Sequence, residues 1–114
     1  MSHISKNICF RVMAEYGSSG IWEFVHDETG PWRHSMANYR RLGLPDELER
    51  DFKEWISDYE DKNLAGELDH VQFNCTGLSL AYRLYDHLDK SNYVEYQGEL
   101  EGGDLDDPIE IGSL

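Results

Sequence analysis

Basic residues are scarce in this sequence. Ten Lys and Arg stand against 23 Asp and Glu among 114 residues, which gives a net charge of −13. Because so acidic a surface repels phosphate backbones and anionic lipid headgroups, we expect no direct binding to nucleic acid or to a membrane surface. No apolar run approaches the roughly 20 residues that span a bilayer, and the first ten residues lack the pattern of a signal peptide. We therefore expect a cytoplasmic protein.

Cysteine is equally sparse. Cys9 and Cys75 are the two cysteines, and their separation matches neither a disulfide framework nor a zinc-binding spacing. Both fall in segments with the pattern of regular structure, where a cysteine is usually a small buried apolar residue. We expect a reduced chain with no metal and no other cofactor.

Aromatic residues, in contrast, are plentiful. Seven Tyr, four Phe and three Trp argue against a disordered acidic chain, because disorder accompanies few aromatics. The length suits one core, so we predict a single domain over residues 1–114.

The expected elements give an α+β fold. Residues 8–14 and 93–99 have the alternation of strands, and residues 21–26 and 31–36 flank a turn signal, which predicts a hairpin or long loop. Two helices separate these strands, so the order is strand, helix, helix, strand, with a possible extra hairpin after the first strand. This order predicts a small two-layer domain. Residues 100–114 form an acidic tail or an edge extension.

The first helix is predicted from Pro45 to about Lys62. Proline suits the first helical position, and two acids directly after it favour the positive end of the helix dipole. The apolar face then follows a helical spacing, with the residues Leu48, Phe52, Trp55, Ile56 and Tyr59.

The second helix is predicted to start at about residue 70 and to end at Ser91 and Asn92. Asp69 followed by Gln72 resembles a capping box. Gly77 lies on the apolar face, where it lowers helix propensity by about 1 kcal/mol relative to Ala. Close approach of the first helix or of a strand to the second helix would explain a glycine at this position.

Two segments hold the whole acidic excess. Residues 46–69 contain ten acids and three bases, and residues 95–114 contain seven acids and no base, so each carries −7. In the first segment, acids spaced 4, 3, 4 and 3 form one stripe of the helix, about 120° from its apolar face: Glu47, Asp51, Glu54, Asp58 and Asp61. Like charges at this spacing cost a few tenths of a kcal/mol per pair. The pattern therefore favours a surface for a basic protein partner over a merely solvated face.

Catalysis, metal binding and nucleic-acid binding receive weaker support. No nucleophile motif is present, although His26 and His34 flank a turn with two carboxylates and could belong to a small metal-dependent hydrolase. Trp32 and Tyr39 interleave with Arg33, Arg40 and Arg41, as in a stacking groove for nucleic acid; we expect these arginines to pair instead with acids of the first helix.

The chain resembles small bacterial cytosolic proteins that look like immunity partners of polymorphic toxins, including those of contact-dependent growth inhibition systems. The resemblance rests on the Tyr16-Gly17 turn, the Ile21-Trp22 pair, the Leu44-Pro45 step before a helix, and the run from Tyr93 to Tyr96, within residues 8–98. It implies a non-enzymatic inhibitor of a toxin domain, often a nuclease, and carries over no functional residues. Residues 26–41 and the acidic tail depart from the common form.

We therefore predict an immunity protein that binds a cognate basic toxin domain one to one and is a monomer when free. The expected toxin interface consists of the acidic stripe together with two aromatic anchors: Glu47, Asp51, Glu54, Asp58, Asp61, Trp32 and Tyr39. The alternatives are the small hydrolase that uses His26 and His34, and an acidic regulatory adaptor that binds through its tail.

Overall fold

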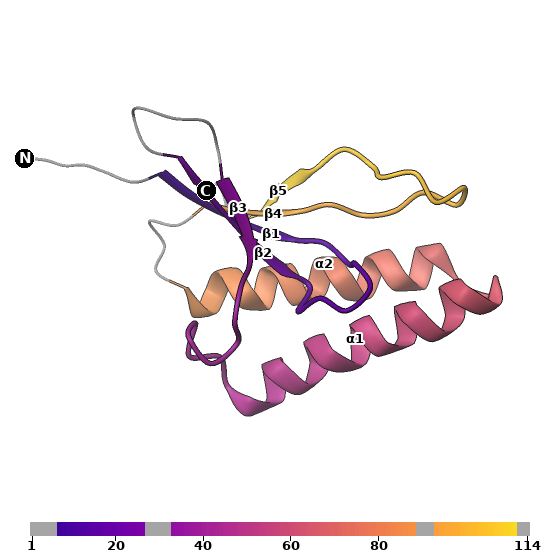
Figure 1. The fold of residues 1–114 in the computed structure, drawn as a ribbon, viewed down its shortest axis with the longest axis horizontal. Helices are drawn as coiled ribbons and strands as arrows, with labels where there is room; N and C mark the ends of the chain where they lie inside the picture. Colours follow the sequence, from indigo (N-terminus) through magenta and orange to yellow (C-terminus); the bar gives the residue numbers. More distant parts are fainter. Residues whose placement is uncertain (1–6, 27–32, 89–92, 112–114) are drawn as a thin grey trace, which may run out of the picture.

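The protein folds into two layers, a five-stranded sheet and a pair of helices on one of its faces (Figure 1). The computed structural model describes residues 7–26, 33–88 and 93–111. The strands are β1 (Asn7–Val12), β2 (Ile21–His26), β3 (Arg33–Met36), β4 (Tyr93–Tyr96) and β5 (Ile109–Ile111), and the helices are α1 (Asp46–Ala65) and α2 (His70–His87). The α+β class and the element order are as predicted, and the extra hairpin is β2–β3.

The sheet is mixed, in the order β3-β2-β1-β4-β5. Each neighbouring pair is antiparallel except β1 and β4, which run parallel with Phe10 opposite Val94. Within the predicted tail or edge extension, residues 109–111 extend the sheet edge as β5, which pairs with β4. The first predicted strand ends two residues early, at Val12, and β4 ends at Tyr96 where Glu99 was expected.

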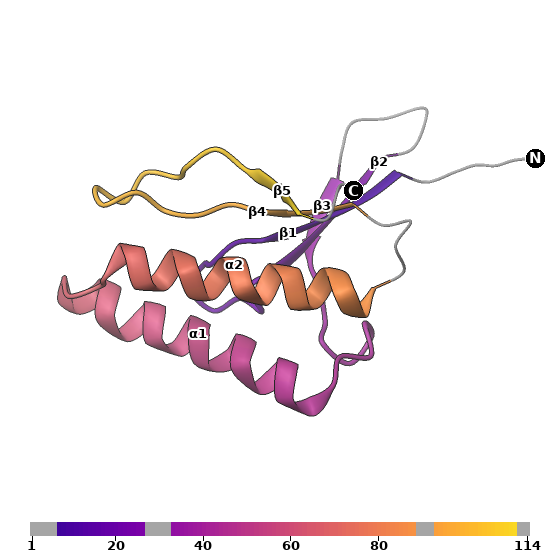
Figure 2. The ribbon, with the colours of Figure 1, turned by 180° about the vertical axis from the view of Figure 1, so that it is seen from behind.

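The core lies between the sheet and the helices. Alternate residues of the two central strands are buried on the helix side, among them Phe10, Val12, Val94 and Tyr96. α2 lies directly against β1, β4 and β5, and α1 packs along α2 (Figure 2). The five predicted apolar residues of α1 are all buried.

The helix ends differ from prediction by a few residues. Pro45 is the N-cap of α1 and not its first helical residue, and the helix runs on to Ala65 before Gly66 caps it in the left-handed conformation. α2 starts at His70 as predicted, with the Asp69 carboxylate accepting from the Gln72 amide, but it ends at His87. The Gln72 side chain contacts Thr76 and does not complete the capping box.

Gly77 lies where α1, α2 and β4 meet. A Cβ at this position would come within 2.5 Å of the Tyr96 ring and 2.6 Å of the Trp55 ring. The close approach predicted from the glycine is thus present, and it comes from both the other helix and a strand.

Candidate functional site

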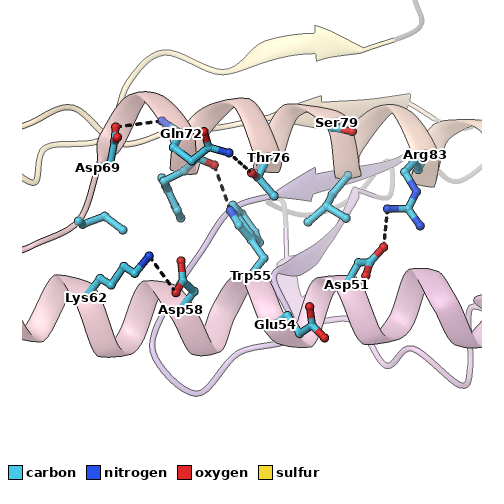
Figure 3. Close-up of a pocket in the computed structure, with 13 residues that line it drawn as sticks. Asp51, Glu54, Trp55, Asp58, Lys62, Asp69, Gln72, Thr76, Ser79 and Arg83 are labelled. Atoms are coloured by element: carbon cyan, nitrogen blue, oxygen red, sulfur yellow. Dashed lines mark hydrogen bonds and ion pairs between the residues drawn. The ribbon is translucent and has the colours of Figure 1, made fainter.

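The candidate site is a groove of about 380 Å³ between α1 and α2. We call it the interhelical groove. In Figure 3, Trp55 and Asp51 of α1 reach toward α2, where Arg83 meets Asp51. It is lined by Asp51, Glu54, Trp55, Asp58, Lys62, Leu68, Asp69, Gln72, Phe73, Thr76, Ser79, Leu80 and Arg83.

The floor of the groove is apolar and rigid. Trp55 is buried and stacks on Phe73, with ring centroids 5.1 Å apart and planes 13° from parallel. The Trp55 indole N–H donates to the Phe73 carbonyl at 3.1 Å, which ties α1 to α2 at the middle of the groove. A buried tryptophan usually finds a partner for its indole N–H, and this bond orients the ring in the groove.

The two walls differ in charge. The α1 wall carries three acids of the predicted stripe, Asp51, Glu54 and Asp58, whereas uncharged Gln72, Thr76 and Ser79 line the α2 wall. Two cations lie at the ends: Arg83 donates to Asp51 at 2.8 Å, and Lys62 lies 3.3 Å from Asp58. These pairs are partly exposed, so each contributes at most about 1 kcal/mol and a partner's cation could replace it at little cost.

The exposed acids of the stripe extend the negative surface along α1. Glu47, Glu54 and Asp61 are exposed. Within the described ranges 7–26, 33–88 and 93–111, none of these three carboxylates forms an ion pair. The structure therefore brings the five predicted acids onto one face, with two of them paired internally.

The two predicted aromatic anchors have different outcomes. Trp32 lies outside the described residues. Tyr39 is half-buried away from the groove, where its ring packs near Phe52 and its hydroxyl donates to the Ser19 carbonyl. Burial, with a smaller effect of nearby Glu49, raises the pKa of Tyr39 to about 12. These contacts give Tyr39 a packing role in the free protein.

The residues of the alternative functions are also placed. His26 and His34 lie on adjacent strands β2 and β3, with His34 opposite Phe24, but their side chains fall outside the described part. Arg41 pairs with Glu23 of β2 at 2.6 Å, so the prediction that it pairs with the first helix was wrong. Among the described side chains, no group of three His, Cys, Asp or Glu is arranged to hold a metal ion.

A buried polar cluster beside the groove was not predicted. Glu99 is buried and accepts from the Tyr59 hydroxyl at 2.9 Å, and its second oxygen lies 3.4 Å from His70 Nε2. The Asn74 amide holds the Glu99 backbone by bonding both its N–H and its C=O. Burial and the bond to Glu99 raise the pKa of Tyr59 well above its ordinary value. The cluster fixes the start of the β4–β5 connection against α1 and α2.

None of the described helices is long and apolar enough to cross a membrane. No known protein family matches the chain, and no curated protein and no solved structure matches it either.

Proposed function

We propose that this chain is an immunity-type inhibitor, which neutralises a basic toxin domain by one-to-one binding and catalyses no reaction. The observation that carries the proposal is the interhelical groove, with an acidic α1 wall above an apolar floor. A nuclease is the kind of toxin that fits best, because its active cleft must be basic to hold a phosphate backbone.

The binding mode follows from the groove. Exposed Glu47, Glu54 and Asp61 attract a basic partner from a distance, since complementary charge accelerates association. Arg and Lys side chains of the partner then make charge-assisted hydrogen bonds to the α1 wall. Apolar atoms of the same partner segment cover the floor that Trp55, Phe73 and Leu80 form.

Capture of the partner is the first test. The tagged chain is purified from its own host with the genes immediately upstream expressed, at about 50 mM and about 500 mM NaCl. We expect one basic protein fragment, recovered one to one and less abundantly at high salt. Absence of a partner at both salt concentrations contradicts the proposal.

Charge reversal tests the surface. We expect the double variant Glu47→Lys, Glu54→Lys to weaken the complex at least about tenfold and to flatten its salt dependence. The matched control is Glu15→Lys, Glu67→Lys, which reverses two exposed acids outside the stripe and changes the net charge equally. Equal losses for both variants, measured by titration calorimetry, would show that net charge and not the groove determines binding.

A further inference from the structure

α2 has a second apolar stripe that is largely exposed, although one of its residues, Leu78, packs against the core. Val71, Cys75, Leu78 and Tyr82 follow a spacing of 4, 3 and 4, which places them on one stripe of the helix. We call this stripe the α2 flank. Val71 is 75% exposed and Tyr82 51% exposed, Cys75 is exposed, and Leu78 is half-buried. No charged residue interrupts the stripe.

The α2 flank points toward the β5 edge of the sheet. On one side of its buried face, α2 meets α1 through the groove residues Gln72, Thr76 and Ser79. α1 contacts the segments that flank β2 and β3, since Phe52 packs near Tyr39 and Ile56 lies beside Gly20. Among the strands, α2 contacts β1, β4 and β5, so the side of α2 that faces away from α1 is the side nearer the β5 end of the sheet.

The outer edge of β5 is available for pairing. β5 is the last strand of the sheet, and its partner within the described residues is β4 alone. Ile109 lies opposite Tyr96, whose ring faces α1, yet Ile109 is 50% exposed. Apolar side chains of both layers are thus exposed near this edge, Ile109 on the sheet and Val71 and Tyr82 on α2.

The negative charge near the β5 edge favours a basic partner there. Residues 95–114 contain seven acids and no base, and the residues from Glu101 to Glu110 are exposed. A second copy of the chain would bring two such acidic edges together, at a cost from like-charge repulsion. A basic segment would be attracted.

We propose that an extended, basic segment of a partner protein adds to the free edge of β5 as a sixth strand. Side chains of a strand alternate between its two faces. Apolar residues at alternate positions of the segment pack on the α2 flank, and the basic residues between them face Glu110 on the other side of the sheet. Main-chain hydrogen bonds hold the segment, and the apolar contacts select it.

Two octapeptides of equal charge test the proposal. One alternates Lys and Val, and the other alternates Lys and Gly. In nuclear magnetic resonance titrations of the whole protein, we expect the Lys–Val peptide to bind at least about tenfold more tightly and to shift the amides of residues 109–111 and 71–82. Equal affinities, no binding of either peptide, or shifts confined to α1 would overturn the proposal.

Variants of the α2 flank give a second measurement. Val71→Asp with Tyr82→Asp should weaken Lys–Val binding at least about tenfold, whereas Leu64→Asp, an exposed aliphatic residue on α1, should not. If the double variant does not fold, Val71→Asp alone serves, since this side chain is three-quarters exposed. An equal loss in Leu64→Asp would overturn the proposal.

Two further outcomes are distinguished. A dimer of the free protein in light scattering, lost in the Val71→Asp variant, would assign the edge to a second copy and overturn the partner segment. The sixth-strand proposal does not depend on the groove. If the peptides do not bind, the proposed inhibitor function still stands. If the groove variants have no effect, the peptides still test the sixth strand.

Discussion

At the scale of the residue, the protein depends on a few positions where separate elements touch. Gly77 is one, with two aromatic rings in the space of a side chain. Glu95 is another: it is buried on β4 opposite Arg11 of β1, and the two side chains form an ion pair. The close packing at Gly77 could be predicted from the sequence, because a glycine on the apolar face of a helix lowers helix propensity and is explained by a neighbouring element that leaves no room for a side chain. The Arg11–Glu95 pair could not, because it depends on which strands become neighbours.

Gly77→Ala should destabilise the fold. The added methyl group would overlap the Tyr96 and Trp55 rings, and overpacking of this kind costs about 1–3 kcal/mol. The gain in helix propensity, about 1 kcal/mol, is smaller than most of this range. Urea unfolding measures the difference. Gly102→Ala is the control, because a Cβ there meets nothing within 4 Å. If Gly77→Ala is as stable as the wild type, the Tyr96 and Trp55 rings move aside at no cost in stability, and the prediction is wrong.

Two buried tyrosines and one half-buried tyrosine should make the protein sensitive to alkali. Burial raises the pKa of Tyr39 to about 12 and raises those of Tyr59 and Tyr96 further above their ordinary value. Because the native state favours the neutral form, this contribution to stability is complete below about pH 10 and is lost as the pH rises through the native pKa values. We expect the last tyrosinate absorbance to appear together with loss of circular dichroism. Complete tyrosine ionisation in a folded protein would contradict this.

At the scale of the element, the helices were predictable and the sheet was less so. The apolar spacing of α1 and α2 is local, so their faces follow directly from the sequence. The acidic stripe was found for the same reason. The interhelical groove also needs Gln72, Thr76, Ser79 and Arg83 of α2, and only the packing of one helix on the other brings them opposite the stripe. Strand order and the β5 pairing depend on contacts between distant segments, which a local pattern does not contain.

The Asn74 side chain should control the β4–β5 connection. It bonds the Glu99 N–H, the Glu99 carbonyl and the Tyr96 hydroxyl, so Asn74→Ala leaves three polar groups without this partner. We expect a loss of about 1–3 kcal/mol in stability and faster amide exchange over residues 97–106. Gln72→Ala is the control on the same helix, since this side chain is exposed and forms a long hydrogen bond of 3.4 Å to Thr76. Unchanged exchange in the Asn74 variant would show that other contacts hold the connection.

At the scale of the whole molecule, acidic charge is concentrated where the fold has room for a partner. One acidic segment, residues 46–69, contains α1 and borders the groove. The other, residues 95–114, contains the β4–β5 connection and reaches the sheet edge. The central strands and α2 are nearly balanced in charge. This division places most of the acidic charge on the surface; the two buried acids, Glu95 and Glu99, bond to Arg11 and to Tyr59.

Added salt should therefore stabilise the free protein. Screening weakens repulsion among exposed charges, and the net charge of −13 leaves repulsion dominant over the partly exposed ion pairs. We expect the free energy of unfolding to rise by roughly 1 kcal/mol between about 20 mM and about 300 mM NaCl, measured by urea titration at each concentration. The variant Glu47→Gln, Glu54→Gln should show a smaller rise. A fall in stability with salt would mean that attraction between the charges dominates.

The parallel pairing of β1 with β4 has a consequence for how the chain assembles. β1 forms its hairpin with β2 after a turn of eight residues, 13–20, but it meets β4 only after both helices have been made. Contacts so distant along the chain form late, because a long loop must close first. On the ribosome, both helices that carry the groove emerge before β4 and β5, so the sheet is completed after the helices have been made. The edge at β5 comes last, so the sixth-strand surface exists only once synthesis has reached the end of the sheet.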